Sequence, residues 1–177
     1  MNISQIYKIG LSGLTANLWM TGHQDHGSSS WNGTTYIARL GGDGMDCFID
    51  RTNNNNMFGE YQNGSFQKST NGGLSWTGAT TGMSGATNWV TIWKQDPTVS
   101  TRLYAGRQNM FVSNNLAVSW SSLTALPATG AVIEFAIAPS NNQVLYVIKS
   151  NNIFKTTNGG TSWSTITGTI PVASVGL

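Results

Sequence analysis

The sequence repeats one short motif at two places far apart in the chain. Residues 71–76 read Asn71-Gly72-Gly73-Leu74-Ser75-Trp76, and residues 158–163 read Asn158-Gly159-Gly160-Thr161-Ser162-Trp163. Each motif closes on an aromatic residue that follows an earlier aromatic residue by 16 to 18 positions, and two degenerate copies keep this spacing. The four pairs are Trp19 and Tyr36, Phe58 and Trp76, Tyr104 and Trp120, and Tyr146 and Trp163. The chain is therefore an internal repeat of four units.

Each unit contains about 44 residues, the usual length of one four-stranded propeller blade and too little for an independent domain. Turn residues separate short alternating runs rich in β-branched and aromatic residues, and no segment has helical periodicity. We predict an all-β fold: one β-propeller segment, residues 1–177, of about four four-stranded antiparallel blades. The expected blades cover residues 3–42, 43–86, 87–130 and 131–171, and residues 172–177 begin a further inner strand.

The second and fourth units allow individual strands to be predicted. In the second unit we expect strands over Met45–Ile49, Met57–Tyr61 and Ser65–Lys68, and a fourth after Trp76. Asn63-Gly64 lies between two of these runs and is a strong hairpin signal, because a type I′ turn needs positive φ at both central residues. The equivalent elements of the fourth unit are strands over Ile133–Ile137, Val144–Ile148 and Ile153–Lys155, with a turn at Asn151-Asn152. The chain opens on an expected inner strand, Ile6–Leu11.

The composition excludes several classes of protein. Charged residues make up 9% of the 177 residues and the net charge is +2, so the chain lacks the basic field that nucleic-acid binding requires. No run of about 18 apolar residues predicts a membrane span, and residues 1–10 do not have the pattern of a signal peptide. The polar surface is carried by Asn, Ser, Thr and Gly, as on many secreted bacterial proteins.

Cys47 is the only cysteine, which excludes an intrachain disulfide and a zinc site built from several cysteines. It lies in the apolar pattern Met45-Asp46-Cys47-Phe48-Ile49. Free cysteine is among the most buried residue types, so we expect a buried, unreactive thiol.

The repeated motif resembles the Asp-box, or BNR repeat, whose pattern is Ser-x-Asp-x-Gly-x-Thr-Trp. The resemblance implies a turn between the third and fourth strands of a blade, with the Trp packed beneath it. Asn71 and Asn158 replace the acidic residue and keep one side-chain oxygen as acceptor. The third copy, residues 113–120, lacks both glycines, and the first, residues 32–36, is one residue shorter. The residues given a structural role are Asn71, Gly73, Trp76, Trp120, Asn158, Gly160 and Trp163, with the three tryptophans at equivalent buried sites.

A second resemblance concerns the stretches Gly22-His23-Gln24-Asp25-His26-Gly27 and Leu40-Gly41-Gly42-Asp43-Gly44-Met45-Asp46. They are similar to blades of large exported bacterial propellers of the sortilin-like and xyloglucanase-like superfamily. The resemblance implies an extracellular or cell-surface protein. Many such proteins, especially from Bacteroidetes, carry a C-terminal tail for type IX secretion, and this sequence shows no such tail.

Asp25 and Asp43 are the candidate catalytic residues. In propeller topology the turn that holds Asp25 and the connection that holds Asp43 lie on the same rim. Glycoside hydrolysis uses a pair of carboxyl groups. In the xyloglucanase-type enzymes that this stretch resembles, one catalytic Asp lies in a comparable turn and its partner comes from a distant blade. The alternative is that both Asp side chains cap turns beside glycines, a local role for which Asp is favoured.

The candidate binding residues are His23, Asp25, His26, Asp43 and Asp46. The two histidines would point to opposite faces of a strand, so we predict no metal site and no cofactor. The tryptophans outside the repeat positions, Trp31, Trp89 and Trp93, are candidates for stacking on sugar rings.

These observations favour a non-catalytic binding or scaffolding propeller module of an exported or cell-surface bacterial protein. The alternatives are a glycoside hydrolase of xyloglucanase type centred on Asp25 and a structural adhesin or surface-layer segment. Blades are apolar on both faces, so an open array needs cover at its ends. The expected partners are the remaining blades of a larger propeller or a second copy of the chain, with a glycan or protein as ligand, no nucleic acid and no membrane insertion.

Overall fold

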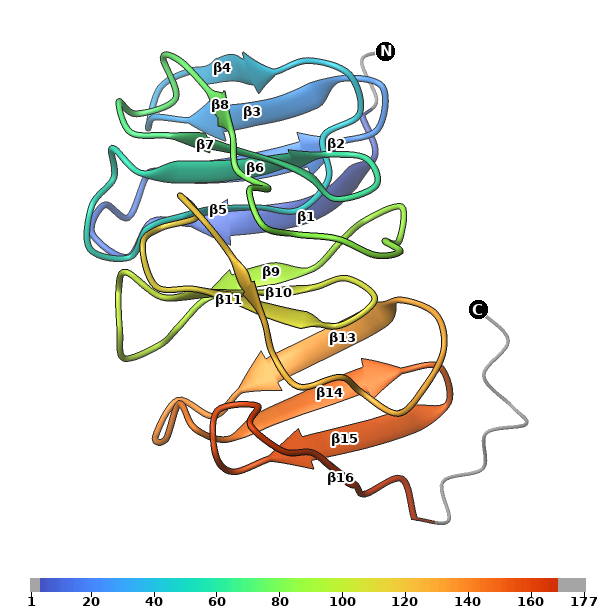
Figure 1. Ribbon diagram of the computed structural model, residues 1–177. Coiled ribbons are helices and arrows are strands. Elements are labelled where there is room, and N and C mark those ends of the chain that lie inside the picture. The colour runs from blue at the N-terminus through green and yellow to red at the C-terminus, as the bar shows by residue number, and fades with distance from the viewer. Residues whose placement is uncertain (1–3, 169–177) are drawn as a thin grey trace.

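The computed structural model describes residues 4–168 and is built from strands alone (Figure 1). Four sheets follow one another along the chain, and each contains four antiparallel strands in sequential order. We number these sheets blades 1 to 4. The predicted all-β fold of four four-stranded blades is confirmed, whereas the strand expected at 172–177 lies outside the described residues. Among residues 4–168 no helix is long and apolar enough to cross a membrane.

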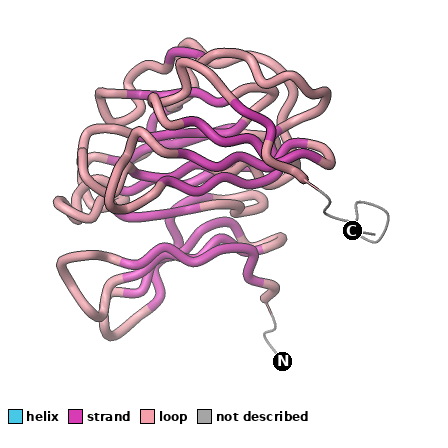
Figure 2. The backbone as a smooth tube through the Cα atoms, turned by 90° about the horizontal axis from the view of Figure 1, so that it is seen from below, coloured by secondary structure: helices cyan, strands magenta, loops and turns pink. Residues whose placement is uncertain are grey.

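The strands of blades 1 and 2 are β1 (Ile6–Leu11), β2 (Trp19–His23), β3 (Gly27–Trp31), β4 (Tyr36–Leu40), β5 (Cys47–Ile49), β6 (Met57–Tyr61), β7 (Ser65–Ser69) and β8 (Thr77–Gly78). The strands of blades 3 and 4 are β9 (Trp93–Gln95), β10 (Leu103–Gly106), β11 (Met110–Ser113), β12 (Ser121–Ser122), β13 (Val132–Ile137), β14 (Leu145–Lys149), β15 (Asn152–Thr156) and β16 (Ser164–Thr165). The first strands of all four blades lie around one axis, because residues of β1, β5, β9 and β13 line a common pocket. Figure 2 shows the strands and the loops between them from below.

The hairpin turns follow the expected chemistry with one shift. Asn63 and Gly64 have φ values of 60° and 70°, as a primed turn requires. In blade 4, Lys149 pairs with Asn152, so the two-residue turn consists of Ser150 and Asn151, and Ser150 has the positive φ of 51°. The prediction of a turn at Asn151-Asn152 was therefore one residue late.

Each blade has a leading face toward the preceding blade and a trailing face toward the following one. The junction between blades 1 and 2 is built on glycine. A Cβ atom at Gly22 would collide with the Met45 carbonyl oxygen, and one at Gly10 would collide with the Cys47 carbonyl oxygen. The side chains between these blades are small or flexible: Met20, Cys47, Ile49 and Met57 form a compact cluster. Cys47 is 2% exposed and burial raises the pKa of its thiol, which confirms the expected buried thiol.

The junction between blades 2 and 3 is aromatic. The rings of Phe66 and Trp93 stack with centroids 4.1 Å apart and planes 5° from parallel. Phe58 meets Trp93 edge to face at 5.6 Å. Offset stacking and edge-to-face contact are the favoured arrangements of aromatic pairs. At the junction between blades 3 and 4, Tyr104 and Phe135 belong to a second core cluster.

The structure corrects the alignment of the first repeat unit. The sequence spacing aligned Trp19 with Phe58, Tyr104 and Tyr146. The buried neighbour of blade 2 is Met20, so Met20 occupies the trailing-face position and Trp19 points to the leading face. A shift of one residue exchanges the two faces of a strand. Trp19, Trp31 and Tyr36 then form a row across β2, β3 and β4, with centroids 5.5 and 5.0 Å apart.

The turns before β8, β12 and β16 share one hydrogen-bond pattern. In the first, the Ser75 amide donates to Asn71 Oδ1 over 3.0 Å, and the Gly73 amide donates to Ser69 Oγ over 2.9 Å. The same bonds occur around Asn115 and Asn158. The copy that lacks glycine keeps the geometry: Leu116 and Ala117 adopt φ values of 53° and 58°, a conformation that usually favours glycine.

The three tryptophans after these turns are not equally buried, which corrects the expectation of equivalent buried sites. Trp120 is 5% exposed, lies in the core between blades 2 and 3, and donates its Nε1–H to the Ala79 carbonyl oxygen over 2.8 Å. Trp76 and Trp163 are half-buried. The Nε1–H of Trp76 donates within its own turn, to Gly73 O. The depth of each tryptophan thus depends on the neighbouring blade and not on the repeat position.

Candidate functional site

The rim of blades 1 and 2 brings Asp25 and Asp43 together. Asp25 lies in the turn between β2 and β3 with a φ of 60°. Its backbone amide donates to Asp43 Oδ1 over 2.6 Å. Asp43 follows β4 and precedes Gly44, whose amide donates to the His23 carbonyl oxygen over 2.9 Å. The contact between the two acidic residues is therefore a carboxylate accepting from a turn amide, and the Asp25 side chain is exposed.

The two histidines of this rim make separate local contacts. The ring of His23 lies between Thr21 Oγ1 at 2.6 Å and Ser4 Oγ at 2.9 Å. Burial, helped by nearby His26, lowers the pKa of His23. His26 Nδ1 lies 3.0 Å from the Gln24 carbonyl oxygen. Within residues 4–168 no three His, Cys, Asp or Glu side chains are grouped so that they could hold a metal ion.

Asp46 lies apart from the rim, at the axis of the blades. Its carboxyl accepts the Cys47 amide over 2.9 Å and the Trp93 amide over 3.4 Å. Burial raises its pKa to about 6, while the ammonium groups of Lys8 and Lys94 oppose that increase. Asp46 therefore links blade 2 to blade 3.

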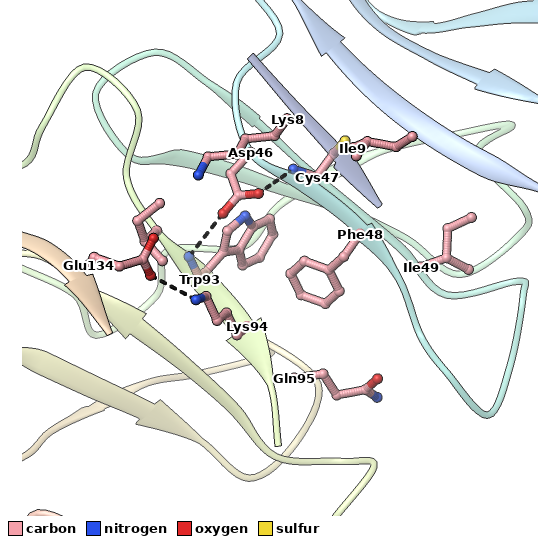
Figure 3. Close-up of a pocket in the computed structure, with 11 residues that line it drawn as sticks. Lys8, Ile9, Asp46, Cys47, Phe48, Ile49, Trp93, Lys94, Gln95 and Glu134 are labelled. Atoms are coloured by element: carbon pink, nitrogen blue, oxygen red, sulfur yellow. Dashed lines mark hydrogen bonds and ion pairs between the residues drawn. The ribbon is translucent and has the colours of Figure 1, made fainter. Parts of the chain in front are cut away.

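A pocket of about 320 Å³ lies on this axis (Figure 3). Its walls come from the first strands of the four blades and combine apolar side chains such as Phe48 with Lys8 and Asp46. Lys94 and Glu134 form an ion pair at 2.7 Å, and Lys94 also donates to the Phe135 carbonyl oxygen over 2.7 Å. The pocket is amphipathic and its charged groups are of both signs.

Sequence reasoning missed Glu60, a fully buried acid in strand β6. It is 0% exposed, and burial raises its pKa to about 8. Its carboxyl accepts the Gly64 amide and the Thr91 amide, both over 2.9 Å, and the Asp46 amide over 3.2 Å. The only sequence signal was an acidic residue inside the otherwise apolar strand β6. Glu60 thus ties β6 to the segment that leads into blade 3.

The tryptophans considered for sugar stacking have different surroundings. Trp93 is 1% exposed and belongs to the core, so the expectation was wrong for this residue. Trp89 is 48% exposed. Trp31 lies in the aromatic row of blade 1, where its neighbours are Trp19 and Tyr36. Because these rings contact one another, they pack as a cluster and do not form an open coplanar platform.

The fold is similar to that of known propellers. An ancestral GH74 enzyme aligns with a TM-score of 0.72 and 16% identity over 92% of this chain and 24% of its own. The GH74 xyloglucanase from Xanthomonas campestris aligns with a TM-score of 0.74 and 12% identity, over 94% of this chain and 31% of its own. YCF48 from Cyanidioschyzon merolae has a TM-score of 0.60 and 13% identity, over 92% and 56%.

No protein-family model matches the chain, and no curated protein sequence is significantly similar to it. The structural likenesses, all below 25% identity, establish the fold alone: the chain forms four blades of a β-propeller. It spans 24% and 31% of the two enzymes. The predicted membership of the Asp-box repeat family remains a prediction, as do the binding residues of the rim.

Proposed function

We propose that the chain is a non-catalytic scaffolding or binding β-propeller module of an exported or cell-surface bacterial protein. Its partners are the remaining blades of a larger propeller or a second copy of the chain, and its ligand is a glycan or a protein. The observation that carries this proposal is the apolar leading face of blade 1, which no other blade within residues 4–168 covers.

The free leading face of blade 1 is strongly apolar. Ile6, Ile9 and Leu11 of β1 are 54%, 59% and 66% exposed, and the aromatic row of Trp19, Trp31 and Tyr36 continues from Leu11 across the sheet. On soluble proteins, large contiguous apolar patches usually mark an interface. This face is therefore suited to pack against other β-structure.

The rim supports a role without catalysis. Hydrolysis of a glycoside uses two carboxyl groups that face each other across the bond to be cleaved. Here one Asp43 oxygen already accepts the Asp25 amide over 2.6 Å. The low charge content, 9% of residues, and the surface rich in Asn, Ser, Thr and Gly support an exported location.

Sedimentation tests the scaffolding role. The isolated 18.9 kDa chain is expected to associate as its concentration rises, and Leu11→Lys should shift it toward the monomer because a charge would be buried in the contact. Leu74→Lys is the matched control, since Leu74 is 82% exposed but lies in a turn away from this face. A wild-type chain that stays monomeric at every concentration contradicts the proposal.

A second candidate is a glycoside hydrolase of xyloglucanase type, and the likeness to GH74 enzymes favours it. It predicts release of reducing sugar from xyloglucan and loss of that release in Asp25→Asn, with Glu134→Gln as a control outside the rim. We expect no release from the wild-type chain. Asp25-dependent release would replace the non-catalytic proposal by the enzymatic one.

A further inference from the structure

At each of the three internal junctions, one blade donates a hydrogen bond to a carbonyl oxygen in the same turn of the following blade, although the donor lies at a different position each time. Arg39 Nη1 in blade 1 donates to the Gly73 carbonyl oxygen over 3.2 Å, and Lys68 Nζ in blade 2 donates to the Leu116 carbonyl oxygen over 3.3 Å. At the third junction the Thr124 amide donates to the Gly160 carbonyl oxygen over 3.2 Å. Every acceptor lies in the turn before the fourth strand of the following blade. Each blade therefore donates to that turn of its successor.

Blade 4, which has no described successor, carries a lysine at the position of Lys68, where blades 1 and 3 have Ser30 and Val112. In blade 2, Lys68 pairs across the sheet with Phe58, the second residue of β6. In blade 4, Lys155 pairs in the same way with Tyr146, the second residue of β14. The Lys155 ammonium lies over the Tyr146 ring, 5.5 Å from its centroid. Lys155 thus stands on the trailing face at the position from which Lys68 reaches the next blade.

The apolar residues around Lys155 also correspond to apolar residues of the internal junctions. Phe58 and Tyr104 are 1% and 2% exposed beneath the following blades, whereas Tyr146 is 38% exposed. Ile148 and Ile166, on the same side of blade 4, are 39% and 43% exposed. The trailing face of blade 4 therefore carries residues typical of an internal junction, but these residues are exposed.

We propose that the trailing face of blade 4, formed by Tyr146, Ile148, Ile153 and Lys155, docks a further β-blade whose third and fourth strands are joined by the Asn-containing turn. Lys155 donates to a backbone carbonyl oxygen of that turn. The inference rests on the scaffolding function proposed above. A second copy of the chain would offer only blade 1, where the turn at residues 32–36 has the shorter form, so the favoured occupant is a blade like blades 2 to 4.

The test adds such a blade to the full chain. A copy of residues 87–130 is attached after residue 171, because blade 3 is the natural successor of the Lys68-bearing blade. Hydrogen exchange should then be slower at the amides of β14 and β15 than in the four-blade chain. In the extended chain, Lys155→Met should increase the unfolding equilibrium constant about tenfold, the usual effect of losing a hydrogen bond from a charged donor. In the four-blade chain it should change it less than twofold.

Lys68→Met is the internal comparison, since it removes the equivalent bond in both chains and should weaken both equally. Lys155→Arg should restore the extended chain. A copy of residues 43–86 serves as a second added blade in case the first is not accommodated. Unprotected β14 and β15 amides with both added blades, or equal effects of Lys155→Met in the two chains, overturn the docking proposal. Xyloglucan hydrolysis would instead overturn only the non-catalytic function.

Discussion

Blade 2 contacts its two neighbours through different kinds of residue, glycine toward blade 1 and aromatic side chains toward blade 3. Toward blade 1, Gly22 and Gly10 bring backbone against backbone, and an added methyl group would collide with a carbonyl oxygen. Toward blade 3, Phe66 and Trp93 fill the space with stacked rings. All three blades are nevertheless four-stranded sheets with their strands in sequential order. The comparison shows that the repeat fixes the strands of each blade, while side-chain volume sets how two blades meet.

The largest effect is expected where the aromatic junction loses its central ring. Trp93→Ala should lower the free energy of unfolding by about 3–5 kcal/mol, the range for deletion of a large buried side chain. Trp89→Ala, at a 48% exposed position nearby, should change it by less than about 0.5 kcal/mol. Urea denaturation measures both. Equal losses would mean that Trp93 is not the centre of this junction.

The same repeat position can be compared at the two junctions. Trp120 belongs to the aromatic core and Trp76 packs half-buried against the cluster between blades 1 and 2. Trp120→Ala should therefore cost about 3 kcal/mol and Trp76→Ala about 1 kcal/mol, because the cost follows the buried contact that is lost. Denaturant midpoints of the two variants check the order, and a larger loss for Trp76→Ala would refute it.

The glycine junction should be sensitive to an added atom. Gly22→Ala is expected to cost about 2 kcal/mol, since its Cβ would collide with backbone that has no room to move and overpacking carries a penalty of that order. Gly41→Ala is the control, because nothing lies within 4 Å of its Cβ position. Thermal unfolding of the pair reports the difference. Equal stability of the two variants would show that the blades separate at little cost.

The last comparison concerns the acids that link blades 2 and 3, whose burial should make the stability of the fold depend on pH. Folding raises the pKa of Glu60 to about 8 and that of Asp46 to about 6. The folded chain then holds protons that the unfolded chain has released, so the free energy of unfolding should fall as pH rises from about 4 to 8. The slope is at most about 1.4 kcal/mol per pH unit for each group. The slope is reduced by nearby positive charges, which are Lys8 and Lys94 beside Asp46 and Arg107 beside Glu60.

Urea denaturation at a series of pH values measures this slope. Glu60→Gln should flatten the slope above about pH 7, where Asp46, with a pKa of about 6, has released its proton. Glu134→Gln, at the exposed ion pair of the axial pocket, should leave the slope unchanged. A wild-type chain whose stability rises between pH 5 and 8 would show that the Glu60 carboxylate is stabilised by its amide donors more than burial destabilises it.

The sequence predicted the rim better than it predicted the core. Topology placed Asp25 and Asp43 on one side, and the structure joins them by a hydrogen bond. The alignment of Trp19 with Phe58, Tyr104 and Tyr146 placed Trp19 on the wrong face of its strand. The turn of the first unit is one residue shorter, so the spacing to that turn does not identify the equivalent strand residue. Glu60 was missed because its partner Thr91 lies 31 residues away, and no local pattern connects the two.

The sequence by itself determined that the chain has four units, that each is a four-stranded antiparallel blade, and where most strands and turns lie. These features depend on alternation, on turn residues and on a repeated motif, all of which act over a few neighbouring residues. Only the tertiary structure decided that Trp120 is buried and Trp76 half-buried, which face Trp19 occupies, and how far the pKa of Glu60 is raised. Those properties depend on which blade packs against which, through contacts between residues 31 to 47 positions apart.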